Sequence, residues 1–170
     1  CEHTRGVSYN GVENNKFDYV EGIPADIIRA DIEYANAVEA ALEGQTDALV
    51  INDTGRMLAD TETIQKLDGR VNFICLDKIE PFVDKNDLSE FGCVKGRLVE
   101  FVKFDSRYAP LAWMLLGKTL IVDSIEEAVK LAENTKDEYK FVTLKGEFVS
   151  GDGVIKLGPL GKATGLISRK

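Results

Sequence analysis

The glycine-rich end of the chain carries the residues best suited to hold phosphate, because backbone amides in such loops can bind an anion. Six glycines lie between residues 146 and 165. A phosphate loop of the Walker type needs two glycines with four residues between them, followed by lysine and a hydroxyl residue. The run Gly158-Pro159-Leu160-Gly161-Lys162-Ala163 has neither the spacing nor the hydroxyl residue, and Gly151-Asp152-Gly153 is not followed by the third glycine of a dinucleotide loop. We therefore interpret these glycines as turn residues or as points of close backbone approach.

Side chains for acid–base or nucleophilic catalysis are present but do not form a recognisable set. His3 is the only histidine, and no Ser-His-Asp or Cys-His arrangement can be built around it. Paired acids such as Asp152 with Glu147, or Asp105 with Asp123, could exchange protons. Helix caps and turns explain Asp105 and Asp152 more simply. The sequence therefore predicts no catalysis in this chain.

The cysteines argue against metal and disulfide chemistry. Cys1, Cys75 and Cys93 are odd in number, and no two are spaced as Cys-x-x-Cys. A disulfide framework or a four-thiolate zinc site is not expected, so we predict no metal and no cofactor. This cysteine usage fits a reducing cytoplasm. No apolar run approaches the roughly 20 residues of a membrane span, so no membrane partner is expected.

The order of helical and strand patterns predicts how these residues are positioned. Residues 24–30 indicate a helix or a short strand, and Asp31 is a plausible cap of a helix that ends near Gly44. An apolar run at 49–51 predicts a buried strand. A helix with Leu58, Ile64 and Leu67 as candidate buried residues is expected next. A strand at 71–76 follows.

The same order then appears a second time. Asp105 is expected to cap a helix that ends at Gly117, and residues 120–122 predict a strand. A helix over 125–134 and a strand at 141–144 complete this second copy. Four short matches carry the repeat in the same order: Asp31-x-x-Tyr34-Ala35 with Asp105-x-x-Tyr108-Ala109, Leu42-Glu43-Gly44 with Leu115-Leu116-Gly117, Leu49-Val50-Ile51-Asn52-Asp53 with Leu120-Ile121-Val122-Asp123, and Phe73-Ile74-Cys75-Leu76-Asp77 with Phe141-Val142-Thr143-Leu144-Lys145. We therefore predict an α/β (α+β) fold of two similar lobes, each a small mixed sheet with packed helices.

The repeat also sets the expected domain boundaries. Residues 1–20 are polar and form a lead-in, residues 21–79 form lobe 1, and residues 80–103 connect the lobes. Residues 104–170 form lobe 2 and a glycine-rich tail. Charge divides along the same line: the net charge is −8, ten acids lie between residues 21 and 62, and none lies after residue 152. This charge argues against a protein that binds nucleic acid over its whole surface.

Several of these segments resemble the hinge domain of SMC (structural maintenance of chromosomes) proteins. Residues 24–44 resemble the opening of such hinges, and Gly69-Arg70-Val71-Asn72-Phe73 with Leu76-Asp77-Lys78-Ile79 resembles a characteristic element. Residues 108–117 and 121–128 resemble the second half, and residues 141–147, 153–155 and 168–170 resemble its close. The similarity runs from about residue 22 to the end. Leu157-Gly158 stands where many hinges carry a double glycine.

The resemblance implies a two-lobed hinge that joins two coiled-coil arms and pairs with a second hinge. A homodimer is favoured, and a heterodimer is possible. The full protein would be an ATPase through heads outside this fragment. It would be cytoplasmic, associated with the nucleoid or chromosome, and would act in chromosome condensation, segregation or cohesion.

Two sets of tail residues follow from this interpretation. The glycines and apolar residues of the tail can cover a partner, and an edge strand could pair across the interface; the expected dimer residues are Gly153, Val154, Ile155, Leu157, Gly158, Leu160, Gly161, Gly165 and Leu166. Weak, salt-sensitive and sequence-independent DNA binding is expected from Lys156, Lys162, Arg169 and Lys170. The alternative function is a small-molecule-binding or catalytic α/β domain, which would need a deep pocket with convergent polar groups.

Overall fold

The computed structural model describes residues 18–135 and 138–161, and it divides the chain into two compact units built from interleaved segments. Unit 1 takes the described residues up to Arg29, with Glu43–Val83 and Lys103–Met114. Unit 2 takes Ala30–Leu42, Asp84–Val102 and the described residues from Leu115 onward. The units thus differ from continuous lobes at 21–79 and 104–170. The helix after Asp31 belongs to unit 2, and most of the helix after Asp105 belongs to unit 1.

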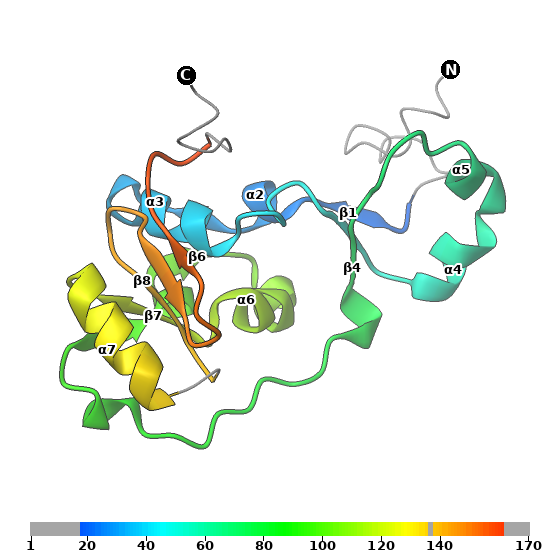
Figure 1. Cartoon of the computed structure of the whole chain (residues 1–170). Helices are drawn as coiled ribbons and strands as arrows, with labels where there is room; N and C mark the ends of the chain where they lie inside the picture. Colours follow the sequence, from blue (N-terminus) through cyan, green and yellow to red (C-terminus); the bar gives the residue numbers. More distant parts are fainter. Residues whose placement is uncertain (1–17, 136–137, 162–170) are drawn as a thin grey trace, which may run out of the picture. The chain divides into compact units, whose positions relative to one another are not determined.

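Unit 1 contains a three-stranded sheet in the order β1-β3-β4 (Figure 1). Its strands are β1 (Val20–Gly22), β3 (Leu49–Ile51) and β4 (Phe73–Cys75). β3 runs antiparallel to β1 and parallel to β4. The other elements of this unit are short helices and turns: α2 (Pro24–Ile27), α4 (Thr54–Ala59), α5 (Thr61–Gln65), η3 (Leu76–Lys78), η6 (Ser106–Tyr108) and most of α6 (Ala109–Leu116).

The sequence predicts one helix over residues 58–67, but the structure has two helices, α4 and α5, with Asp60 between them. Asp53 caps α4 by accepting a hydrogen bond from the Arg56 amide, and Asp60 caps α5 by accepting from the Thr63 amide. Because α4 begins at Thr54, Met57 faces the core and Leu58 faces outward, 58% exposed. The prediction that Leu58 is buried is therefore wrong.

The core of unit 1 includes residues that the sequence assigned to a polar lead-in. Tyr19 and Val20 are buried beside Leu49, Ile51 and Met57. The Tyr19 hydroxyl donates to Asp60 at 2.8 Å. The folded part of the chain thus includes Tyr19 and Val20.

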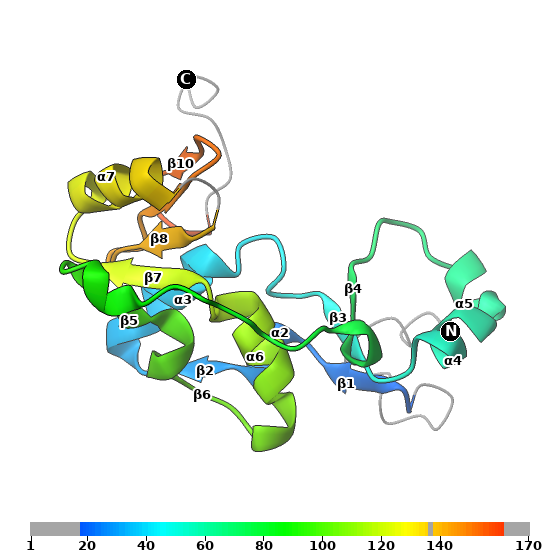
Figure 2. The ribbon, with the colours of Figure 1, turned by 90° about the horizontal axis from the view of Figure 1, so that it is seen from below.

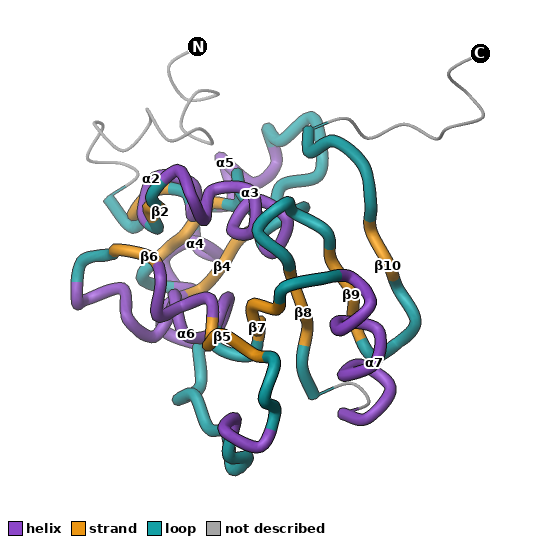
Figure 3. The backbone as a smooth tube through the Cα atoms, turned by 90° about the vertical axis from the view of Figure 1, so that its left-hand side faces the viewer, coloured by secondary structure: helices purple, strands orange, loops and turns teal. Residues whose placement is uncertain are grey.

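Unit 2 contains a five-stranded sheet in the order β10-β9-β8-β7-β5 (Figure 3). Only the β7–β8 pairing is parallel. The strands are β5 (Val94–Arg97), β7 (Thr119–Val122), β8 (Lys140–Val142), β9 (Phe148–Ser150) and β10 (Ile155–Lys156). The helical elements are α3 (Ile32–Ala41), α7 (Ile125–Thr135), η4 (Leu88–Glu90) and η5 (Leu98–Phe101). The segment expected to be a connector therefore supplies β5, one edge of this sheet.

Both faces of this sheet are buried at its centre, where every residue of β7 and β9 is buried. α7 packs against β7, β8 and β9 (Figure 2) and covers Leu120, Phe141 and Val149. Side chains alternate along a strand, so Ile121 and Val142 point to the other face. They are fully buried, and α3 and η5 pack against β8 and β7. A two-stranded sheet of β2 (Arg29–Ala30) and β6 (Val102–Lys103) completes the fold.

The internal repeat is visible in the strand pairing. Each unit has one parallel pair joined by helices, β3–β4 in unit 1 and β7–β8 in unit 2. Leu49 pairs with Phe73, and Leu120 pairs with Phe141. These are the residues that the sequence repeat aligns, so both copies keep one register.

Candidate functional site

The end of the described chain forms an open sheet edge. β10 pairs with β9 on one side, and within the described residues it has no strand on the other side. The Ser150 amide donates to the Val154 carbonyl at 2.9 Å, which makes these two residues a hydrogen-bonded pair. Such pairs alternate along an antiparallel ladder, so Ile155 and Val149 form a non-hydrogen-bonded pair. The amide and carbonyl of Ile155 therefore point away from β9 and are directed toward an added strand.

Apolar side chains accompany this open backbone. Val154, Ile155 and Leu157 are exposed, Ile155 to 51% and Leu157 to 65%. Ile155 lies opposite Val149, on the face of the sheet that α7 covers. An exposed edge strand with apolar side chains is a template for pairing with another chain. The structure thus brings together the expected residues 153–158 in one edge.

The turn that leads into β10 explains the acids and glycines there. The Asp152 carboxylate accepts hydrogen bonds from the Ser150 hydroxyl and from the Val154 amide. The Ser150 hydroxyl bond, with that amide, lowers the pKa of Asp152 despite the opposing effect of burial. Gly153 adopts a φ of 95°, which a side chain would disfavour. Asp152 therefore holds a turn rather than a proton-transfer site.

Leu160, one of the expected dimer residues, contacts its own unit. It is half-buried, and a methyl group built on Gly146 would lie 2.9 Å from its Cδ1 atom and 3.3 Å from the Asn36 carbonyl. The tail thus folds back onto Gly146 and α3 of its own unit. Gly158 and Gly161 both have positive φ, 105° and 80°, so both serve turns at this return. Gly165 and Leu166 lie outside the described residues.

Lys156 is the one member of the expected DNA-binding set that the structure describes. Its ammonium lies 5.0 Å from the centroid of the Phe148 ring, on the face of the sheet opposite Ile155. Lys162, Arg169 and Lys170 lie outside the described residues. The grouping of these four cations stays a prediction.

A second open edge lies in unit 1. β4 pairs with β3 alone among the strands of the part that the structure describes. Phe73 and Cys75 of β4 are half-buried, whereas Ile74 is buried. This edge offers an extended backbone of the same length as β3.

Unit 1 has a polar pocket of about 220 Å³, which could hold a small molecule. It is lined by Glu21, Gly22, Asp26, Ile27, Arg29, Asp105, Arg107 and Tyr108. The Tyr108 hydroxyl donates to Glu21 Oε1 at 2.7 Å, and Asn52 donates to Oε2 at 2.5 Å. Burial opposes ionisation of Glu21, but these bonds outweigh it and lower its pKa. Burial and the bond to Glu21 raise the pKa of Tyr108 to about 12.

Neither of these two groups titrates near neutral pH, so they do not form a poised acid–base pair. Among residues 18–135 and 138–161, no group of three or more His, Cys, Asp or Glu side chains could hold a metal ion. In the same part of the chain, no helix is long and apolar enough to cross a membrane. The geometry gives no support to the alternative of a catalytic or small-molecule domain.

Comparison with known families matches residues 17–132 to the model described as "SMC proteins Flexible Hinge Domain". The chain is 31% identical to the chromosome partition protein Smc of Methanococcus voltae over 148 residues, which is 85% of this chain and 12% of that protein. It is also 31% identical to the protein of that name from Rhodopirellula baltica, over 88% of this chain and 13% of that one. The chain thus spans about an eighth of these curated relatives.

Solved structures resemble the chain over most of its length. An asymmetric dimer of the SMC hinge domain from Geobacillus stearothermophilus has a TM-score of 0.73 and 26% identity, over 88% of this chain and 62% of that one. The SMC hinge domain of Pyrococcus furiosus has a TM-score of 0.69 and 26% identity, over 93% of this chain and 84% of that one. The predicted two-part α/β fold agrees with both.

Proposed function

Because this chain belongs to the family of SMC protein flexible hinge domains, we propose that it joins two SMC subunits by pairing with a second hinge. The observation that carries the proposal is the open, apolar edge of β10. One of the solved structures that this chain resembles, from Geobacillus stearothermophilus, is a dimer of such a hinge. A chain with this fold and this edge has the means to make the same kind of contact.

Backbone pairing and apolar burial act together at this edge. The amide and carbonyl of Ile155 supply hydrogen bonds, each worth about 0.5–1.5 kcal/mol net. Burial of Val154, Ile155 and Leu157 adds part of the roughly 1.5–3 kcal/mol that full burial of each would give. These gains must exceed the cost of bringing two chains together.

We propose the edge of β4 in unit 1 of the partner as the surface that receives β10. It is an extended edge of unit 1, and seven of the ten acids between residues 21 and 62 belong to this unit. The tail after residue 152 carries basic residues and no acids. A two-fold arrangement makes the contact twice and closes the assembly. A homodimer is favoured, and a heterodimer with another hinge uses the same chemistry.

The role of the whole protein is part of this proposal. The relatives are named for chromosome partition, so we place this hinge in a chromosome-associated SMC protein that acts in condensation, segregation or cohesion. ATP would be bound and hydrolysed by heads outside this fragment, and no bond chemistry or cofactor is assigned to the hinge. DNA contacts would be weak and independent of sequence, with Lys156 as the described contributor.

Light scattering after size exclusion tests the pairing. Ile155→Glu places a charge in the proposed interface and is expected to give a folded monomer at micromolar concentration. Leu58→Glu is the matched control, since Leu58 is 58% exposed on α4 and Ile155 is 51% exposed on β10. The control should keep the dimer mass. A dimeric Ile155→Glu variant, or a monomeric wild type, would overturn the proposal.

A further inference from the structure

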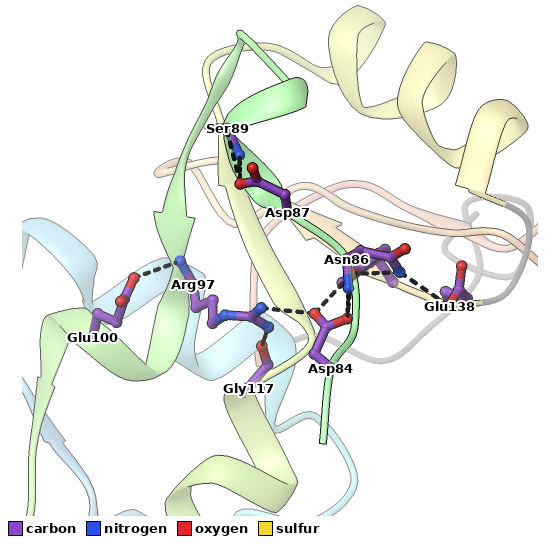
Figure 4. Close-up of polar contacts among 9 residues, drawn as sticks. Asp84, Asn86, Asp87, Ser89, Arg97, Glu100, Gly117 and Glu138 are labelled. Carbon is purple, nitrogen blue, oxygen red and sulfur yellow. Dashed lines mark hydrogen bonds and ion pairs between the residues drawn. The ribbon is translucent and has the colours of Figure 1, made fainter. Parts of the chain in front are cut away.

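We propose that Arg97 is a clamp that fastens two of the crossings between the units onto unit 2. This inference goes beyond pairing with a second hinge. The chain passes from one unit to the other at five places, after residues 29, 42, 83, 102 and 114. Any motion or load carried along the backbone between the units must pass through these five crossings. The side chain of Arg97 reaches the unit 2 end of two of them (Figure 4).

The first crossing is held through Asp84, the first residue of unit 2 after Val83. Arg97 Nη2 lies 2.7 Å from Asp84 Oδ2. The two side chains are 13% and 2% exposed. A buried ion pair is sensitive to loss of either partner, because the remaining charge is left without compensation.

The second crossing is held through Gly117, which directly follows α6. Arg97 Nη1 donates to the Gly117 carbonyl at 2.7 Å. Unit 2 resumes at Leu115, only two residues earlier. Carbonyls at a helix C-terminus lack partners within the helix, and a positive charge there is favourable. The guanidinium thus caps α6 and binds Asp84 with different nitrogens.

Asp84 is held from further sides. The Tyr139 hydroxyl lies 2.8 and 2.7 Å from its two oxygens, and the Asn86 amide donates to Oδ1 at 3.1 Å. The Asn86 side chain donates to the Tyr139 hydroxyl at 3.0 Å and to Glu138 at 3.2 Å. These hydrogen bonds connect residues 84–86 to Glu138 and Tyr139, which directly precede β8. Of the side chains that bind Asp84, Arg97 is the one that also donates to the Gly117 carbonyl.

The chemistry of arginine suits this position. Its planar guanidinium presents several donors in a fixed fork, whereas lysine offers one compact charge. Lys95, two residues earlier on β5, shows the contrast: it pairs at 3.2 Å with Asp123, and both side chains are well exposed. Exposed pairs of that kind contribute little. Lys95 is therefore a control on the same strand.

Limited trypsin digestion of the dimeric protein tests the clamp. Lys85 lies between Asp84 and Asn86, and Lys118 follows Gly117, so each reports opening of one crossing. Cleavage tracks the open population when opening is faster than cleavage. Arg97→Met is expected to raise cleavage after both Lys85 and Lys118 by about tenfold or more. Lys95→Met should leave both rates unchanged.

Two further variants separate the clamp from general loss of stability. Tyr139→Phe removes the hydroxyl that contacts Asp84 and Asn86 but leaves the bond from Arg97 to Gly117, so cleavage should rise at Lys85 and not at Lys118. Arg97→Lys keeps the charge but not the fork, and should give a smaller rise at both sites if Arg97→Met fails to fold. Arg56 lies within helix α4 of unit 1, so its cleavage requires that part of unit 1 to open. A uniform rise at Lys85, Lys118 and Arg56, or no rise at Lys118 in both Arg97 variants, would overturn the proposal.

Discussion

Unit 1 and unit 2 contain the same parallel strand pair, but the pair is buried to different depths. In unit 2, β5 lies beside β7 and β9 lies beside β8, so both strands are internal and Phe141 is fully buried. In unit 1, β4 is an edge strand, and the equivalent Phe73 is only half-buried. The neighbouring strands therefore decide whether the repeated parallel pair is internal to a sheet or includes an edge strand. In unit 2 the open edge is β10, which is outside the repeated pair, whereas in unit 1 it is β4, which belongs to the pair.

Truncating the two equivalent phenylalanines should expose this difference most strongly. Phe141→Ala is expected to lower the free energy of unfolding by about 3–5 kcal/mol, because it leaves a cavity between the sheet and α7. Phe73→Ala should cost roughly half as much, since part of that ring already contacts solvent. Urea unfolding at one fixed protein concentration measures both, because dimerisation makes stability depend on concentration. Equal losses would show that the strand neighbours do not set the depth of burial.

The buried carboxylates give a second comparison between the units. Asp84 in unit 2 is bound by Tyr139 and Arg97, and Glu21 in unit 1 is bound by Tyr108, with Arg107 at 3.8 Å and largely exposed. Burial opposes ionisation of Asp84, but the bonds from Tyr139, the Asn86 amide and Arg97 outweigh it and lower its pKa. The pKa of Glu21 is lowered as well.

A group with a lowered folded-state pKa stabilises the fold above its unfolded pKa, and this contribution is lost as the pH falls through the folded value. Asp84→Asn is therefore expected to cost about 1–3 kcal/mol near pH 7. The difference from wild type should shrink below about pH 4, where the unfolded carboxyl takes up a proton. Glu21→Gln should show the same trend with a smaller amplitude. Unfolding curves between pH 7 and 3 measure both, and a difference that grows in acid would contradict the assignment.

The sequence repeat predicts the parallel strand pair of each unit but not the strands and helices that pack around it. The strand at 49–51 was predicted with its bounds, and Asp31 and Asp105 both stand directly before helical segments. Local periodicity and caps encode these features. Which unit a helix packs into depends on contacts distant in sequence, so the assignment of α3 to unit 2 was not visible. Arg97 was missed for the same reason, because its partners Asp84 and Gly117 lie 13 and 20 residues away along the chain.

The tail shows the same limit at the level of single residues. Its glycines and apolar residues predicted an edge strand, and β10 is one. Leu160 packs beside Gly146, which is 14 residues earlier in the chain, and no short-range sequence pattern predicts this contact. The positive φ of Gly158 and Gly161 shows that both glycines serve the backbone turns of their own chain. That they also contact the partner in a dimer stays a prediction.

The smallest expected effect concerns the two sides of β10. The amide of Ile155 points to the open edge, whereas that of Lys156 belongs to the hydrogen-bonded pair with Phe148 on β9. Ile155→Ala removes the apolar side chain alone, and Ile155→Pro also removes the outward donor, which an edge strand tolerates. One hydrogen bond is worth about 0.5–1.5 kcal/mol at each of the two equivalent contacts, so the dissociation constant of the proline variant should exceed that of the alanine variant by about five- to 100-fold. Sedimentation equilibrium gives both dissociation constants, with circular dichroism as the check of folding. Identical constants would mean that side chains alone hold the partner and that the backbone of β10 does not extend the sheet across the dimer.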